Sequence, residues 1–240
     1  MADQAALPEP RLRDRAWRRF LRGPDQALVE ELYVPALQRG VRYDRCCAYF
    51  SSSVLSAAAR GFAGLISRLL ANATAPRPSV RLVVNEELAE DDVRALTESG
   101  DTSALEALLT KRLKNPKEAL EKERLAMLGW LVKQGWLEVR VGVMRRGEGI
   151  VHAKFGIVTD PQGDAVVFAG SGNESASGLM ANYERLEIST SWDDAERYGE
   201  YRDEFEQLWS DRHPDVHTVS LPEALRLKLI RFAPKAPPAR

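Results

Sequence analysis

The sequence predicts an α/β fold, an α/β sandwich in which helices flank a mixed sheet. Segments with strand composition alternate with helical segments along the chain, which is typical of that class. The chain has 240 residues, 44% hydrophobic and 29% charged, which is enough for one domain with a sizeable core. In its second half several strand-like segments follow one another, and two of them are joined by a short turn, so part of the sheet should be antiparallel.

The first third of the chain predicts a basic helix followed by a strand–helix–strand unit. Residues 1–10 contain two prolines and are expected to be flexible. A helix is predicted over 11–22, because four arginines share one helical face: Arg11, Arg15, Arg18 and Arg22. Such a face can hold phosphates, although a solvated surface is the more common interpretation. Next come a strand at 41–50, a serine-capped helix at 51–70 and a strand at 80–85.

The remaining elements complete a single predicted domain over 11–232. An acidic stretch at 85–101 and a long segment at 103–135 are predicted to be helical, with a restart at Asn115 and Pro116 and a stop at Gly135. The last helix, at 193–211, should bury one face, and four strands precede it: 136–144, 150–158, 165–171 and 184–192. Residues 233–240 form a proline-rich tail that suits a linker or a frayed terminus.

Charge and cysteine content narrow the class of protein. The net charge of −1 argues against nucleic-acid binding by overall charge, so any basic site must be local. Cys46 and Cys47 are neighbours on a predicted strand and would point to opposite faces, so we expect buried thiols in a reducing compartment. We see no signal peptide and no apolar run long enough to span a bilayer, and we expect a cytoplasmic protein with no membrane partner.

The stretch IVHAKFGIVTDPQGDAVVFAGSGNES carries the candidate catalytic residues. His152 and Lys154 would share one face of a strand, and a turn at 160–163 would bring Ser171 and Asn173 back beside them. An imidazole can act as a nucleophile and, when protonated, as a general acid. Lysine, serine and asparagine donors, with the amides of a helix expected near residue 175, can hold an anionic oxygen. This constellation predicts phosphoryl-transfer chemistry.

The motif HAK followed by GSGNES resembles the HxK…GSxN signature of the phospholipase D superfamily. Downstream, NYERLEI resembles the N-x-E element of that superfamily, and residues 41–66 are similar to the opening of bacterial members fused to superfamily-2 helicases. The resemblance covers about residues 28–209 and implies the family fold and these site residues: His152, Lys154, Ser171, Asn173 and Glu184. In one departure, the family's aspartate position is Thr159 here, and Asp160 follows it; the shift would turn the carboxylate to the other strand face.

The resemblance also implies a phosphohistidine mechanism that uses neither a metal nor a cofactor. A complete site needs two HxK motifs, and this chain has one, because His213 and His217 do not repeat the pattern and fit surface histidines better than a metal site. We therefore expect a twofold homodimer in which His152 of each protomer meets its partner. Glu184, or less favourably Glu187, should orient the imidazole.

The function expected from these features is that of a metal-independent DNA nuclease. Arg145 and Arg146 precede the catalytic strand and would bind phosphates without sequence preference, and lipid-facing segments are absent from the sequence. The likeness to helicase-fused members predicts a bacterial restriction or defence role with a fused or partner ATPase. Two alternatives stay open: a non-catalytic nucleic-acid-binding or dimerisation module, and a lipid phosphodiesterase.

Overall fold

The computed structural model describes residues 10–23, 27–88, 91, 124–147, 149–173, 176–177, 181–226 and 231–232. Eight of the strands in these residues form one sheet in the order β1-β8-β7-β6-β2-β3-β5-β9. Their bounds are β1 (Phe20–Arg22), β2 (Arg42–Cys47), β3 (Val80–Val84), β5 (Leu137–Met144), β6 (Phe155–Thr159), β7 (Ala165–Gly170), β8 (Arg185–Thr190) and β9 (Val216–Ser220).

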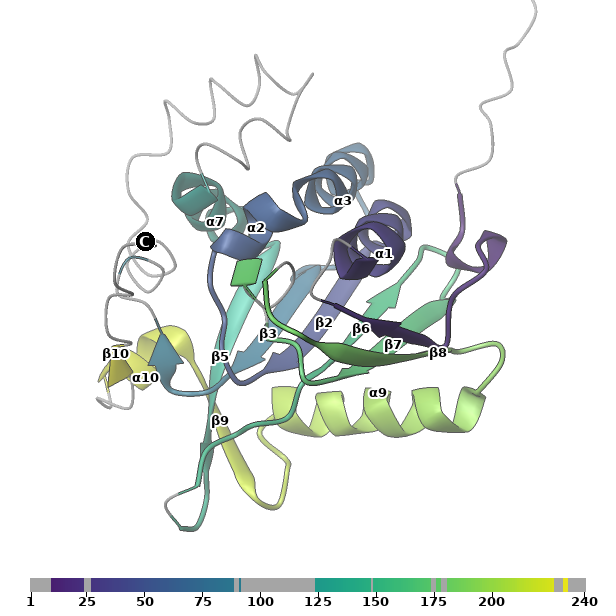
Figure 1. Cartoon of the computed structure of the whole chain (residues 1–240). Helices are drawn as coiled ribbons and strands as arrows, with labels where there is room; N and C mark the ends of the chain where they lie inside the picture. The colour runs from purple at the N-terminus through teal and green to yellow at the C-terminus, as the bar shows by residue number, and fades with distance from the viewer. Residues whose placement is uncertain are drawn as a thin grey trace, which may run out of the picture.

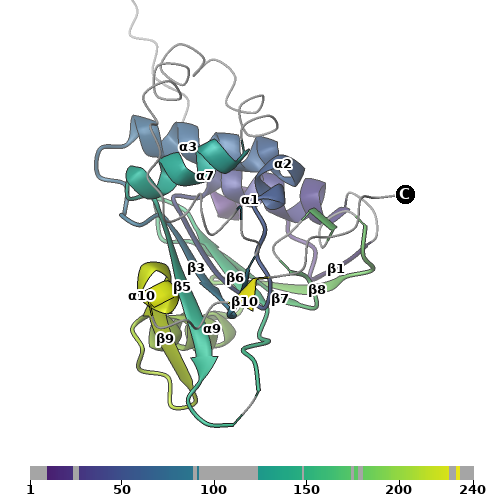
Figure 2. The same ribbon diagram turned by 90° about the vertical axis from the view of Figure 1, so that its left-hand side faces the viewer.

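The sheet is mixed, and helices cover both of its faces. β2, β3 and β5 run parallel to one another, whereas β6, β7, β8, β1 and β9 pair antiparallel with their neighbours. Figure 1 shows α9 beneath the sheet and the other long helices above it, and Figure 2 shows the same layers from the side. The predicted α/β class, with a mixed sheet flanked by helices, is confirmed.

The upper helical layer forms the larger of the two cores. It consists of η2 (Leu28–Tyr33), α1 (Val34–Arg39), α2 (Ser53–Ala57), α3 (Ala59–Ala71) and α7 (Arg124–Lys133). α3 buries an apolar stripe with helical spacing that includes Phe62, Leu65, Ile66 and Leu69. α7 stops at Gly135, which has a φ of +70° and donates to the carbonyl of Val132 at 2.9 Å, so this predicted stop is confirmed.

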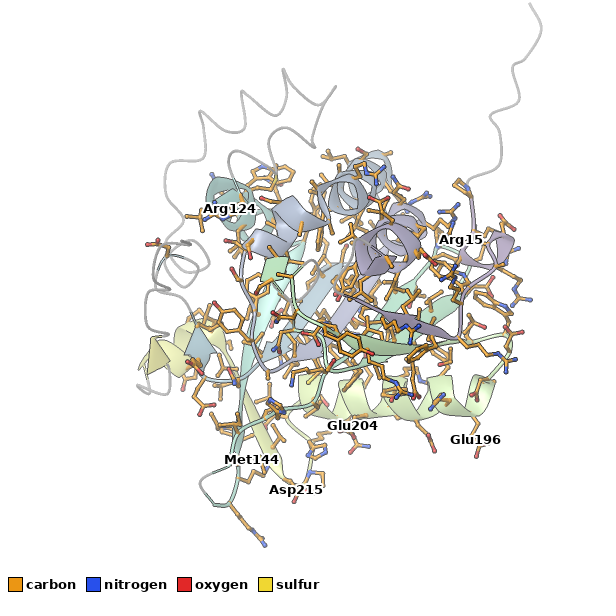
Figure 3. The ribbon with its side chains drawn as sticks, viewed as in Figure 1. Arg15, Arg124, Met144, Glu196, Glu204 and Asp215 are labelled. Carbon is orange, nitrogen blue, oxygen red and sulfur yellow. The ribbon has the colours of Figure 1, made fainter. Side chains whose placement is uncertain are left out.

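On the other face, α9 (Ala195–Trp209) covers the second core. The Asp194 side chain accepts from the Arg197 amide at 3.1 Å and caps the helix. Phe205 and Leu208 are buried, as the periodicity predicts, and Tyr198 and Tyr201 pack beside them. In Figure 3 the labelled carboxylates Glu196 and Glu204 extend away from the sheet. α9 is therefore amphipathic, with an apolar face that closes the second core.

The two cysteines confirm the expected alternation of β2. Cys46 belongs to the core between the sheet and α9, and Cys47 belongs to the core between the sheet and the other helices. Both are buried free thiols, and burial raises the pKa of Cys46 to about 12. A thiol with so high a pKa is almost entirely protonated at neutral pH, so Cys46 acts as a small apolar residue.

The predicted helix over 11–22 is wrong. The structure has a short 3-10 turn, η1 (Leu12–Asp14), followed by the edge strand β1. Arg11 and Arg13 both bind Asp164, at 2.8 and 2.6 Å, and Leu12 is fully buried. These contacts with distant residues outweigh the intrinsic helical preference of arginine, because tertiary contacts routinely override propensity. The arginines therefore do not form a common phosphate-binding face.

Several smaller elements complete the described fold. α10 (Leu221–Arg226) follows β9, and β4 (Glu87–Leu88) pairs with β10 (Arg231–Phe232) in a separate two-stranded sheet. Figure 3 shows Met144 and Asp215 at the same end of the antiparallel pair of β5 and β9. Most of the acidic stretch at 85–101, the predicted helix restart at 115–116 and the tail at 233–240 lie outside the described residues. Among the helices that the structure describes, none is long and apolar enough to cross a membrane.

Candidate active site

His152 and Lys154 lie in the four residues that directly precede β6. The prediction put them inside a strand, but β6 begins at Phe155. Val151 and Phe155, each 4% exposed, anchor both ends of this segment in the core between the sheet and α9. His152 is exposed and Lys154 is half-buried, so both candidate residues face away from this core, and Ala153 between them is exposed as well.

Lys154 lies against the imidazole of His152. Its Nζ is 3.2 Å from Nδ1 and 3.0 Å from Nε2 of the ring, and it donates to the His152 carbonyl at 3.1 Å. A neutral imidazole has one acceptor nitrogen, which can accept from the Lys154 ammonium or act as a nucleophile. The pair therefore combines a nucleophile with a nearby positive charge.

The GSGN loop returns beside this pair through the predicted hairpin. β6 and β7 are antiparallel, the turn closes with a bond from the Gly163 amide to the Asp160 carbonyl at 3.1 Å, and the Gly170 amide donates to the Lys154 carbonyl at 3.1 Å. Gly170 has no room for a side chain, because a Cβ would collide with the carbonyl of Arg185. A glycine is thus required where β7 leaves the sheet and enters the site.

Asn173 is held by its side-chain oxygen. Oδ1 accepts from the Tyr49 amide at 3.1 Å, at the end of the segment that follows β2. The amide nitrogen of the same side chain is thereby directed away from that backbone contact and keeps its two donors. Of the helix predicted near residue 175, only residues 176 and 177 are described; the Ala176 amide donates to Ser53 Oγ at 3.0 Å.

Glu184 contacts the loop rather than the histidine. Its Oε2 accepts from Ser171 Oγ at 2.5 Å and its Oε1 from Asn182 Nδ2 at 3.4 Å, and it is only 6% exposed. No hydrogen bond joins Glu184 to His152 within the described part of the chain. Glu187 is exposed on the other face of β8, where it pairs with Arg197 at 3.4 Å. Four of the five predicted residues are therefore joined in two pairs, His152 with Lys154 and Ser171 with Glu184, while Asn173 is held separately by the Tyr49 amide.

Arg45 is a site residue that the sequence did not indicate. It is fully buried in β2, donates through Nη2 to the Gly172 carbonyl at 2.5 Å, and lies 5.3 Å above the Phe168 ring. It therefore fixes the backbone of the GSGN loop at Gly172. A single arginine in an apolar strand carries no motif, and Gly172 is 127 positions away, so no local signal could have found this contact.

Burial and charge together lower the pKa of Lys154. Burial is the largest cause and the positive charge of Arg45 the second, while the negative charge of Glu184 opposes both. A buried cation without a counter-ion loses its proton more readily, and a neighbouring carboxylate partly restores it. The balance between Arg45 and Glu184 therefore influences the charge at the centre of the site.

Asp160, the displaced family aspartate, lies at the opposite end of β6 from His152. Its carboxylate is 2% exposed and accepts three backbone amides, those of Leu12 at 3.0 Å, Gln162 at 2.9 Å and Asp164 at 3.0 Å. It thus closes the β6–β7 turn and holds the N-terminal segment. A carboxylate with these contacts takes no part in the reacting centre.

The other two histidines are surface residues with acidic partners. His213 lies 3.3 Å from Glu204, and His217 lies 3.0 Å from Asp211. In the part of the chain that the structure describes, no group of three or more His, Cys, Asp or Glu side chains could hold a metal ion. Arg145, which the sequence suggested for phosphate binding, instead bonds to Asp211 at 2.6 Å.

Comparisons with known proteins agree with this fold. The family model for the phospholipase D-like domain of cardiolipin synthase matches residues 64–209, more than half of the chain. Structures with a similar arrangement include NucT from Helicobacter pylori, at 16% identity and a TM-score of 0.45, covering 82% of this chain and 99% of that one. They also include Nuc, a phospholipase D family member from Salmonella typhimurium, at 15% identity and a TM-score of 0.37, covering 77% and 88%.

No curated protein sequence matches the chain. The family model matches the sequence over residues 64–209, which include the HxK and GSxN elements, the strands β6 and β7 between them, and α9. The protein therefore belongs to the phospholipase D-like family of phosphodiesterases.

Proposed function

We propose that this protein is a metal-independent nuclease that cleaves DNA through a phosphohistidine intermediate. The observation that carries the proposal is the contact of Lys154 with the His152 ring, beside a loop that presents Ser171 and Asn173. A nucleophile, a cation and neutral donors around one exposed position are what in-line attack on a phosphodiester requires. The names of the structural neighbours NucT and Nuc agree with a nucleic-acid substrate but add no independent weight.

In the proposed reaction, a neutral ring nitrogen of His152 attacks phosphorus and the P–O bond to the leaving group breaks. The leaving oxygen takes a proton from a second, protonated histidine. A water then attacks phosphorus and gives its proton to that histidine, and the P–N bond breaks and releases His152. Lys154 and Asn173 hold the non-bridging oxygens, on which negative charge increases in the transition state. Glu184 orders the loop through Ser171.

The second histidine comes from a second copy of the chain in this proposal. One HxK motif per chain leaves the general acid unassigned, and a twofold axis would supply His152 of the partner protomer. Large exposed apolar side chains flank the site: Ile150, 47% exposed, precedes His152, and Tyr183, 66% exposed, precedes Glu184. Apolar surface of this kind beside an incomplete site supports a self-complementary interface.

The biological setting follows from the same resemblance. Members fused to superfamily-2 helicases open with a strand and helix like residues 41–66, which supports a role beside a fused or partner ATPase in bacterial restriction or defence. In such a system the nuclease domain needs little sequence preference of its own, because the partner selects the DNA.

The experiment that tests the proposal is DNA cleavage in excess EDTA by the wild-type chain and His152→Ala. We expect the wild type to cut single- or double-stranded DNA in EDTA, and the variant to lose at least about a thousandfold in rate, the scale seen when a nucleophile is removed. His217→Ala is the matched control, because its ring lies on β9 and contacts Asp211 instead of the site.

Three other results would contradict the proposal in different ways. Loss of cleavage in EDTA would show that a metal is required. Hydrolysis of phosphatidyl headgroups without DNA cleavage would favour a lipid phosphodiesterase. If both proteins bind DNA alike and neither cuts any phosphodiester, the chain is a non-catalytic binding or dimerisation module.

A further inference from the structure

A groove with an exposed aromatic ring and several arginines lies on the α9 side of β1 and β8. We call it the β1–β8 groove and define it by its aromatic and charged lining residues: Trp17, Phe20, Arg19, Arg185 and Arg197, with the carboxylates Glu187, Asp193 and Asp194. It encloses about 510 Å³, and a second hollow of about 490 Å³ lies on the other side of Phe20 beside Arg22. Phe20 therefore forms a ridge between two open hollows.

The strand register explains why these side chains gather on one face. Leu21 of β1 pairs with Leu186 of β8, and both are buried, at 2% and 1% exposure. Their neighbours must then point to the opposite face, since side chains alternate along a strand. Phe20 and Arg22 thus join Arg185 on the face that α9 partly covers, at the edge of the sheet visible in Figure 1.

The groove begins where the candidate active site ends. The Arg185 amide donates to Ser171 Oγ at 3.0 Å, and the Ser171 amide donates to the Arg185 carbonyl at 3.1 Å. The backbone of Arg185 thus contacts the GSGN loop, while its guanidinium lies 4.7 Å above the Phe20 ring. A polymer bound at the active site would reach the groove within about two residues of β8, or roughly 7 Å.

Not every arginine of the groove is equally available to an anionic ligand. Glu187 lies 3.8 Å from Arg185 and 3.4 Å from Arg197, which offsets part of their charge. Across the described residues, by contrast, no carboxylate forms a salt bridge with Arg19 or Arg22, and both are exposed. Asp193 and Asp194 also line the groove, so its charges nearly balance overall, and Arg19 and Arg22 are the arginines on either side of Phe20 that remain available for direct phosphate contacts.

We propose that the β1–β8 groove binds single-stranded nucleic acid that leads away from the active site, with a base stacked on Phe20 and phosphates on Arg19 and Arg22. This inference rests on the proposed nuclease function and names the form of its substrate. Alternating cations and an exposed ring suit a single strand, because only unpaired bases offer a face for stacking. Recognition of this kind does not depend on sequence.

The test is binding of a fluorescein-labelled oligothymidylate by the full chain carrying His152→Ala, measured by fluorescence anisotropy in EDTA. We expect Phe20→Ala to weaken binding about tenfold and Phe20→Tyr to restore it, because tyrosine keeps the stacking face. Arg19→Ala and Arg22→Ala should each reduce the dependence of log K on log salt by about 0.7. Leu70→Ala, at an exposed apolar position on α3, is the matched control and should bind normally.

The Glu187→Gln variant should strengthen binding of the oligonucleotide instead of weakening it. Removing this carboxylate releases Arg185 and Arg197 for phosphate contacts, so binding should tighten roughly two- to fivefold. Unchanged binding by both Phe20→Ala and Glu187→Gln would overturn the groove proposal, as would a duplex bound in preference to the single strand.

Hydrolysis of bis(p-nitrophenyl) phosphate separates this inference from the function on which it rests. This small diester tests the chemistry alone, because it is too short to span from the site to Phe20. If the wild type does not hydrolyse it but binds oligothymidylate through Phe20, the groove stands and the nuclease proposal fails. If hydrolysis depends on His152 while binding ignores Phe20, the nuclease proposal stands and the groove fails.

Discussion

Arg45 and Glu184 act on the pKa of Lys154 in opposite directions, although only Glu184 belongs to a recognisable motif. Arg45 supports the GSGN loop through Gly172 and lowers the pKa of Lys154, whereas Glu184 raises it. Lys154 can hold a phosphate oxygen as a cation only while it is protonated, so its pKa, together with that of the protonated histidine, shapes the alkaline limb of the pH–rate profile in the proposed mechanism. The two neighbours can be tested separately because their charges have opposite signs.

Arg45→Met should move the alkaline limb of the pH–rate profile to higher pH. Removing a positive charge near Lys154 stabilises the ammonium, which raises the pKa of that lysine. The loop also loses its contact at Gly172, so kcat/KM should fall about 10- to 100-fold. Steady-state rates on oligonucleotides from pH 6 to 10 would show both effects.

The control for this prediction is Arg81→Met. Arg81 is also buried, but it pairs with Asp44 at 2.6 Å between the sheet and α9, away from the site. Its loss leaves a buried carboxylate unpaired and should lower the free energy of unfolding by about 3–5 kcal/mol without moving the alkaline limb. A limb that moves equally in both variants would mean that loss of stability, rather than local charge, causes the shift.

Glu184→Gln should move the alkaline limb in the other direction, to lower pH. Glutamine keeps an acceptor oxygen for Ser171 but removes the negative charge that favours protonated Lys154. The pKa of the lysine then falls, and activity is lost at lower pH. The same pH series measures it, with Glu138→Gln on β5 as a surface control; an unchanged limb would exclude electrostatic coupling between Glu184 and Lys154.

At the scale of elements, the β6–β7 hairpin connects the active site to the N-terminal segment. His152 and the GSGN loop lie at one end of the hairpin, and Asp160 and the turn lie at the other. The same turn region carries Asp164, whose pKa is lowered by its hydrogen bond to Arg13 and by the charge of that guanidinium and of Arg11. The far end of the hairpin thus has a structural function, which accounts for the displaced aspartate.

Asp160→Ala should therefore destabilise the protein without inactivating it. Three backbone amides lose their acceptor, which should lower the free energy of unfolding by about 2–3 kcal/mol. Urea unfolding measures the loss, and cleavage assayed well below the midpoint should stay within about threefold of wild type. Asp160→Asn keeps one acceptor and should be intermediate; an inactive but fully stable alanine variant would show a catalytic role instead.

At the scale of the whole molecule, the proposed site is complete only when two copies meet. Each chain places one exposed HxK segment at the ends of the sheet strands, next to Ile150 and Tyr183. The β1–β8 groove lies on the α9 side of the sheet, behind β8 as seen from the GSGN loop. If two copies meet at the active site, the groove therefore stays accessible, and a nucleic-acid strand can run from the site into the groove.

Mixing wild-type chains with His152→Ala chains tests the shared site. If one active site needs both histidines, a mixed dimer is inactive, and activity falls with the square of the wild-type fraction. One wild-type chain in four would then retain about one sixteenth of the activity, instead of one quarter. Subunits must be allowed to exchange before the assay, and sedimentation must confirm dimers; a linear decrease would show that each chain acts alone.

Features that repeat over short distances could be predicted from the sequence. The apolar periodicity of α9, the alternation that separates Cys46 from Cys47, and the hairpin that joins HAK to GSGN all depend on near neighbours in the chain. Backbone geometry translates such local patterns directly into faces and turns. The same holds for Gly135, whose position after α7 marks the end of a helix.

Contacts between distant residues were decided only by the tertiary structure. Arginine spacing at 11–22 resembled a helix, yet Asp160 and Asp164, about 150 positions away, hold that segment in another conformation. β1 has three residues and exists because β8 offers it an edge, so the groove around Phe20 has no local signature. Arg45 likewise becomes a site residue only through Gly172. The sequence by itself determined the family and the candidate residues of the site, since the motif is compact, whereas folding brought together the residues that support and extend it.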